Sequence, residues 1–211
     1  MKKALIFFIV VFGNSWIWSV AERGFWLAAV CVLASVCLFK LLQIKSPKRN
    51  LVVVSVLTLV AIVGFQVKEF DLKSFVETTS LQKDVIDKRM RLYPNPRIAH
   101  WFEQRGESVA FYRILANMGE ALDINYYFFA NHPRERHGVT ESEKFSPLIL
   151  PLFLMGATKL VLEKRHLFYC LLFAFALGFT LLVYPSEPVG FVAVLPFIVS
   201  SSLYSLATYV D

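Results

Sequence analysis

The chain has 211 residues, of which 56% are hydrophobic and 18% charged, and its net charge at pH 7 is +6. Soluble domains are about 45–50% apolar and about 25% charged, so this apolar excess, gathered into long runs, predicts a chain embedded in a bilayer. Residues 67–146 carry 12 basic and 12 acidic residues, so the whole excess of +6 lies beside the apolar runs. Membrane topology produces this distribution, which argues against nucleic-acid binding.

Six apolar runs follow one another, each close to the roughly 20 residues that a helix needs to cross the hydrocarbon of a bilayer. The runs are 4–21, 24–44, 51–67, 147–162, 167–184 and 189–210. They predict an all-α, polytopic bundle of six transmembrane helices. Three helices would lie in residues 1–66 and three in 147–211, with an extracytoplasmic helical segment over 67–146. Prolines are expected to interrupt the fourth and sixth helices.

The first run has two interpretations. A positive start, an apolar stretch and small residues at 19–21 are typical of a cleavable signal peptide. Trp16 and Trp18, however, stand where small polar residues are expected, and a second apolar run begins at Gly24. We therefore favour an uncleaved helix. Cleavage of residues 1–21 would leave the topology of the rest unchanged.

The basic residues of the short loops predict the orientation of the bundle. With the N-terminus inside, nine of them fall on the cytoplasmic side and one, Arg23, falls outside. The nine are Lys2, Lys3, Lys40, Lys45, Lys48, Arg49, Lys159, Lys164 and Arg165. Because cytoplasmic loops are enriched in Lys and Arg, we expect both termini in the cytoplasm of a multi-pass cell-membrane protein.

Local signals predict two helices early in the outer segment. Thr79-Ser80-Leu81-Gln82 has the spacing of a capping box, so a helix is expected over 80–92. Asn95-Pro96 then supplies an N-cap followed by a proline at the first helical position, which predicts a second helix. We expect that helix to stop at Gly106.

A third outer helix is predicted over 107–122, because its apolar residues recur on one helical face. These residues are Phe111, Ile114, Leu115, Met118 and Leu122. Short amphipathic helices anchored at both ends by membrane helices are expected to lie on the outer bilayer surface or to cap the bundle. The four consecutive aromatics at 126–129 suit the headgroup region.

The densest polar group lies at 131–138. Arg134 and Arg136 offer planar donor forks that match phosphate oxygens, so they are candidate ligands for a phospholipid head or a lipid-linked phosphate. His132 and His137 are candidate acids or bases, and Glu135 is a candidate to orient one of them. The alternative is an interfacial loop whose arginines pair with neighbouring carboxylates or bulk lipid phosphates.

Other polar residues predict less chemistry. His100 would have to join His132 and His137 to form a metal site, but the chain has no HxxxH, HExxH or CxxC pattern. We therefore predict no metal and no cofactor. His166 is expected to be a solvated loop residue.

A row of small hydroxyl residues enriches the inner half of the last run: Ser200, Ser201, Ser202, Ser205 and Thr208. Such residues let helices approach closely and bond across the contact, so they predict a packing face or a partner contact. A polar pore lining is the alternative.

Two functions from different classes remain. The first is a non-catalytic membrane subunit or scaffold that contacts a membrane-protein partner or a second copy of itself. The second is an enzyme or binder that acts on a phosphate-bearing lipid at the outer leaflet. An active site would require the polar side chains of 131–138 to converge in a pocket with a second carboxylate, such as Glu103 or Glu107.

Overall fold

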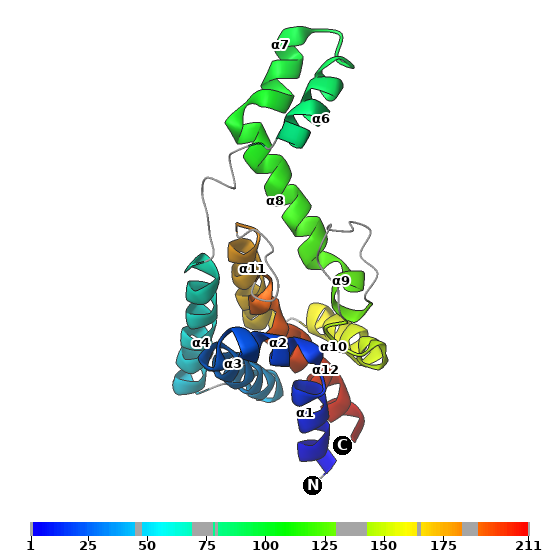
Figure 1. Cartoon of the computed structure of the whole chain (residues 1–211). Helices are drawn as coiled ribbons and strands as arrows, with labels where there is room; N and C mark the ends of the chain where they lie inside the picture. The colour runs from blue at the N-terminus through cyan, green and yellow to red at the C-terminus, as the bar shows by residue number, and fades with distance from the viewer. Residues whose placement is uncertain are drawn as a thin grey trace.

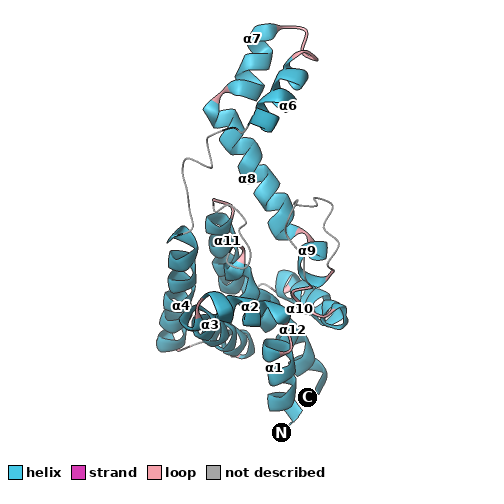
Figure 2. Cartoon of the chain, viewed as in Figure 1, coloured by secondary structure: helices cyan, strands magenta, loops and turns pink. Residues whose placement is uncertain are grey.

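The chain is helical throughout the part that the computed structural model describes, and no strand occurs there (Figure 2). The described residues are 2–44, 48–68, 78, 80–129, 143–163, 166–182 and 190–210. The predicted all-α class is confirmed. The helices form a bundle and an outer hairpin that stands away from it (Figure 1).

The first apolar run is two helices, α1 (Lys2–Phe12) and α2 (Ser15–Arg23). Asn14 causes the break, because its side chain caps α2 by accepting a hydrogen bond from the Ile17 amide at 2.8 Å. The same side chain donates to the Val10 carbonyl at 3.0 Å and so also satisfies the end of α1. The prediction of one continuous helix over 4–21 is therefore wrong.

Two helices are long and apolar enough to cross a membrane, namely α3 (Phe25–Gln43) and α4 (Arg49–Lys68). They indicate membrane association. The remaining apolar helices of the bundle are shorter. These are the 3-10 turn η2 (Pro147–Ile149) with α10 (Leu150–Leu162), then α11 (Leu167–Thr180), and the 3-10 turn η4 (Val192–Val194) with α12 (Leu195–Val210). Helix length alone therefore supports two spans of the six predicted.

Two prolines begin helices where the sequence predicts interruptions. Pro151 lies in the first turn of α10, and Pro196 is the second residue of α12. A proline in the first turn removes an amide that has no helical partner there, so the helix continues undisturbed.

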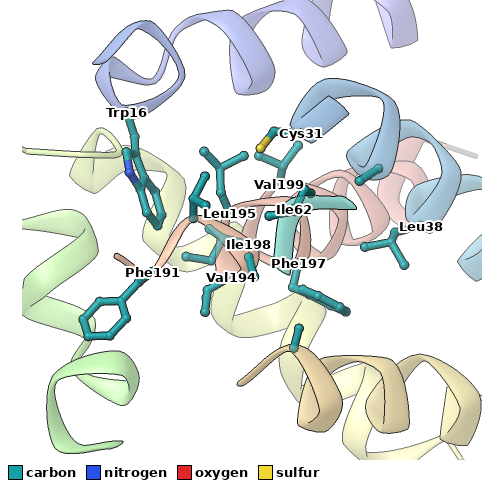
Figure 3. Close-up of a cluster of buried hydrophobic side chains, with 14 of the residues drawn as sticks. Trp16, Cys31, Leu38, Ile62, Phe191, Val194, Leu195, Phe197, Ile198 and Val199 are labelled. Atoms are coloured by element: carbon teal, nitrogen blue, oxygen red, sulfur yellow. The ribbon is translucent and has the colours of Figure 1, made fainter. Parts of the chain in front are cut away.

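Helix α12 occupies the centre of the bundle, and residues 191–205 are buried throughout. It packs chiefly on α10 and α3, and Figure 3 shows its Leu195, Ile198 and Val199 in one buried cluster with Cys31 of α3. The crossing with α10 is close, since a Cβ added at Gly156 would overlap the Ser201 carbonyl oxygen. The last helix of the chain therefore forms the core on which the other helices pack.

The outer hairpin consists of α6 (Ser80–Met90), α7 (Pro96–Ala99), the π-helical turn η1 (His100–Gln104) and α8 (Gly106–Leu122). Helix α6 confirms the predicted first helix and ends two residues earlier. Asn95 is the N-cap of α7, as predicted, and accepts from the Arg97 amide at 2.9 Å. The second helix ends near Arg105, as predicted, but Gly106 is not its stop, because the extended backbone of Arg105 ends the turn and Gly106 begins α8.

Helix α8 connects the hairpin to the bundle. Its 17 residues run without a break to α9 (Ile124–Phe128), and Asn117 fixes its lower end by donating to the Leu181 carbonyl at 2.9 Å. Helices α6 and α7 therefore lie beyond the bundle and do not cap it (Figure 1). Both chain termini lie at the opposite end of the molecule from the hairpin (Figure 1).

Candidate functional site

The predicted anion-binding and acid–base residues lie outside the described part of the chain. They are His132, Arg134, Glu135, Arg136 and His137. Their convergence in a pocket, on which the enzyme hypothesis depends, stays a prediction.

The residues that flank this segment are held firmly on both sides. The Phe145 amide donates to the Tyr127 carbonyl at 2.8 Å, which joins the chain after the segment to helix α9 before it. The Ser15 hydroxyl donates to the Glu143 carbonyl, so the start of α2 also holds the residues that follow the segment. The described residues on the two sides of 130–142 therefore lie side by side.

An aromatic cluster surrounds these attachment points. It consists of Trp16, Tyr126, Tyr127, Phe128 and Phe145. The Trp16 ring centroid lies 5.6 Å from that of Tyr127 and 6.1 Å from that of Phe145. Burial of such large rings contributes substantially to the free energy of folding, so the cluster is expected to be among the stable parts of the fold.

Lys144 is the charged residue that the sequence analysis missed in this region. Only 5% of its surface is exposed, and its ammonium lies 3.6 Å from the centroid of the Tyr126 ring and 3.3 Å from the Tyr126 carbonyl oxygen. A cation over an aromatic face is attracted by the ring electrons, which offsets part of the cost of burial. The aromatic run before the segment was the available signal.

The predicted solvated position of His166 is wrong. Its ring is buried, and Nε2 lies 3.2 Å from the Tyr204 hydroxyl and 3.2 Å from a carboxylate oxygen of Glu163. Helix α11 begins at the next residue, and this turn directs the ring onto α12. His100, by contrast, is exposed and lies 2.8 Å from Gln104 through Nδ1. In the described part of the chain, no three His, Cys, Asp or Glu side chains gather to hold a metal.

The serine row of α12 forms a polar cluster inside the bundle. The Tyr169 hydroxyl lies 2.8 Å from the Ser200 hydroxyl and 3.0 Å from that of Ser201, and it donates to the Phe197 carbonyl at 3.1 Å. Ser202 donates to the Ile198 carbonyl at 2.8 Å within the same helix. The prediction of a packing face is confirmed. A pore lining or a partner contact at these serines is wrong, because the chain's own helices cover them.

The outer hairpin exposes a large apolar surface. Several side chains of η1 and α8 face outward along it: Trp101, Phe102, Phe111, Leu115 and Met118. The Arg105 guanidinium lies 4.6 Å from the centroid of the Trp101 ring. On the other side of α8, Asn117 and Glu120 are buried. The lower part of α8 therefore points polar residues inward and apolar residues outward.

A hollow of about 340 Å³ lies between α6 and α8 on the same hairpin. Val85 and Ile86 line it from α6, and Val109 and Tyr112 line it from α8. Glu103 is buried at its wall and accepts a hydrogen bond from the Tyr93 hydroxyl at 2.8 Å. The hairpin therefore combines exposed aromatic rings with a concave, mostly apolar hollow.

Comparison with known proteins gives no relative: no protein-family model, curated protein or solved structure matches this chain.

Proposed function

We propose that this chain is a multi-pass membrane protein whose bundle lies in the bilayer and whose outer hairpin binds a partner, so that it acts as a non-catalytic membrane subunit. In this proposal six apolar segments span the cell membrane, both termini are cytoplasmic, and residues 67–146 lie outside. The observation that supports embedding in the membrane is the distribution of side chains on two bundle helices, which bury polar residues and expose apolar ones.

Helix α4 has its polar residues on the inside. Ser55, Thr58 and Gln66 are buried, and they fall on one helical face. The exposed face carries apolar residues, among them Val53 and Leu57. A helix surrounded by water has the opposite pattern, because polar groups are solvated there. The pattern of α4 supports contact with lipid.

Helix α11 repeats the reversed pattern. Its buried residues include Tyr169 and Thr180, and its exposed residues include Leu167, Leu171 and Phe175. Helices α4 and α11, which are remote in sequence, thus both expose apolar side chains and bury hydroxyl groups. Burial of a polar group without a hydrogen bond is costly, and these hydroxyls bond within the chain.

The proposed orientation draws support from the placement of the ends. Both termini lie on the side opposite the hairpin (Figure 1), as they must if they are cytoplasmic and the hairpin is outside. Trp18, Phe25 and Trp26 are exposed around the turn between α2 and α3, and aromatic rings of this kind favour the membrane interface.

The role as a subunit depends on the hairpin surface. Tryptophan, other aromatic residues and arginine are enriched at the energetic centres of protein interfaces. Trp101, Phe102 and Phe111 are exposed on η1 and α8, and the half-buried Arg105 lies against the Trp101 ring. Because α8 is an unbroken helix fixed at its base, it presents this surface in one defined position. The proposed partner is another membrane protein or a second copy of the chain.

Native mass spectrometry of the protein, extracted gently from its own membrane, tests this role. We expect a co-purifying protein at fixed stoichiometry that is lost from the double variant Phe111→Ser and Leu115→Ser. The matched control replaces Lys83 and Lys88, exposed on α6, with serine. A chain that is extracted alone, or a complex that persists in the hairpin variant, would contradict the proposal.

The second candidate function is binding of a phosphate-bearing lipid or lipid-linked phosphate by Arg134 and Arg136, with His132, His137 and Glu135 as supporting or catalytic groups. The observation that favours it is the fixed attachment of both flanks of segment 130–142 to the aromatic cluster. Replacement of both arginines by glutamine should release a phosphate-bearing lipid that co-purifies with the protein. Retention of that lipid would reject this function.

A further inference from the structure

A narrow apolar slot penetrates the bundle beside α12. Its volume is about 180 Å³, and it lies between the lower ends of α8 and α9 and the helices α10, α11 and α12. Phe153, Ala157 and Val161 line it from α10, and Cys170 and Phe173 line it from α11.

The slot exists because α10 packs closely on α12 and little on α11. Because Gly156 has no side chain, α10 can approach the Ser201 backbone of α12 closely. This approach separates α10 from α11. Helices α10 and α11 come together at the lower end of the slot, where the Cys170 sulfur lies 3.9 Å from the Leu160 carbonyl oxygen. This contact joins α10 to α11 beside the slot.

The dimensions of the slot fit a hydrocarbon chain. From Phe153 to Val161 the lining runs along about 12 Å of helix, at about 1.5 Å per residue. Its volume exceeds the roughly 150 Å³ of an apolar cavity that stays dry in water and accepts benzene. An unbranched or prenyl chain occupies a space of this shape along its length.

The chemistry of the wall excludes a polar occupant. The hydroxyl groups of its described lining belong to Tyr127, Tyr169 and Ser201, and each already has a hydrogen-bond partner in the chain. Tyr127 donates to the Ala121 carbonyl at 2.8 Å, and the Tyr169 and Ser201 oxygens lie 3.0 Å apart. A water molecule needs two to four polar partners, so water is poorly held there.

The slot also opens onto the surface that faces lipid in the proposed function. Val161 of α10 lines it and is an exposed apolar residue, so its rim continues the outer face of the bundle. Resting on the membrane embedding proposed above, we propose that the slot binds one hydrocarbon chain of a membrane lipid. The chain enters sideways from the bilayer and fills the space between α10 and α11 against α12.

Photolabelling of the full chain tests the proposal. The protein is reconstituted in vesicles of phosphatidylcholine that carries a diazirine in the middle of one acyl chain, and labelled peptides are identified by mass spectrometry. We expect concentrated labelling of α10 and α11 at Ala157, Cys170 and Phe173. Filling the slot by Ala157→Phe or Cys170→Phe should lower this labelling about tenfold, which corresponds to about 1.4 kcal/mol of binding free energy.

The matched control is Met155→Phe, because Met155 is exposed on another face of α10. This variant should keep the wild-type labelling. Labelling spread evenly over all exposed apolar residues, or unchanged in both filling variants, would overturn the slot proposal. Should a filling variant fail to fold, the wild-type labelling map alone still decides between these outcomes.

Extraction with alkaline carbonate separates this proposal from the membrane embedding on which it rests. A chain that remains in the membrane fraction but lacks labelling in the slot rejects the slot alone. A chain that is released into solution rejects the embedding and, with it, the lipid slot.

Discussion

Helix α4 of the bundle and helix α6 of the outer hairpin distribute polar side chains in opposite ways. Helix α4 buries Ser55, Thr58 and Gln66 and exposes valines and leucines. Helix α6 exposes lysines and aspartates along its length. Two helices of one chain thus present different surfaces. In the proposed embedding, the exposed side of α4 meets hydrocarbon and that of α6 meets water.

Adding a single methyl group at the centre of the bundle should have the largest effect. Gly156→Ala places a Cβ against the Ser201 backbone, which cannot move as a side chain does, so we expect a loss of about 3 kcal/mol or more in stability. Fluorescence-detected thermal unfolding of the detergent-extracted protein measures it.

The control is Gly178→Ala on α11, where a Cβ meets no atom within 4 Å. Alanine favours helix over glycine, so this variant should be neutral or slightly stabilised. Equal unfolding temperatures for the two variants would show that α10 and α12 do not cross closely.

Introducing an arginine on α4 and, separately, on α6 tests whether the two helices face hydrocarbon and water. Leu57 is 61% exposed near the middle of α4, and Leu57→Arg should cost about 2.5–3.5 kcal/mol of membrane insertion. Val85, 48% exposed on α6, should accept arginine with little effect. Insertion of the variants into microsomal membranes measures the difference, and equal insertion would refute the contrast between α4 and α6.

Removal of a buried amide should have an intermediate effect. Gln66 is fully buried, donates to the Gly190 carbonyl at 2.8 Å and lies 3.4 Å from the Thr180 hydroxyl. Gln66→Leu leaves these groups without their partner, so stability should fall by about 1–3 kcal/mol in thermal unfolding. The exposed neighbour Val67 is the control, and Val67→Ala should change stability little. A stable Gln66→Leu protein would show that α4 is not joined to the chain around residue 190.

The smallest effect concerns the hairpin and depends on pH. The hydrogen bond from Tyr93 to the Glu103 carboxylate raises the pKa of the Tyr93 hydroxyl above its ordinary value of about 10. Because the folded-state pKa is the higher one, the bond stabilises the hairpin fully below about pH 10. That stability is lost as the pH rises through the folded value. Ultraviolet titration of the wild type and of Tyr93→Phe should differ by one tyrosine that ionises above pH 10, and identical high-pH absorbance would contradict the assignment.

Local signals in the sequence predict the hairpin well. The cap at Asn95 and the start of α6 each depend on residues only a few positions apart in the sequence. Both are found where predicted. The π-helical turn η1 is not predictable in this way. It depends on contacts such as that of the Ser108 hydroxyl with the Trp101 carbonyl and that of Tyr93 with Glu103.

The bundle is less predictable, because its polar contacts join remote residues. His166 and Tyr204 are 38 positions apart, and Gln66 and Gly190 are 124 apart. Hydropathy identifies the apolar runs but gives no sign of which polar group meets which. It also misses the break at Asn14, whose side chain bonds to backbone on both sides. The predicted phosphate site at Arg134 and Arg136 lies outside the described residues and stays a prediction.

The central position of α12 has a consequence for biosynthesis. Helix α12 follows α3 and α10 in the chain, so both are synthesised before the helix on which they pack. Until then Gly156 faces no helix, and Gln66 lacks the carbonyl of Gly190. The growing chain therefore holds these surfaces unpacked until α12 has been synthesised.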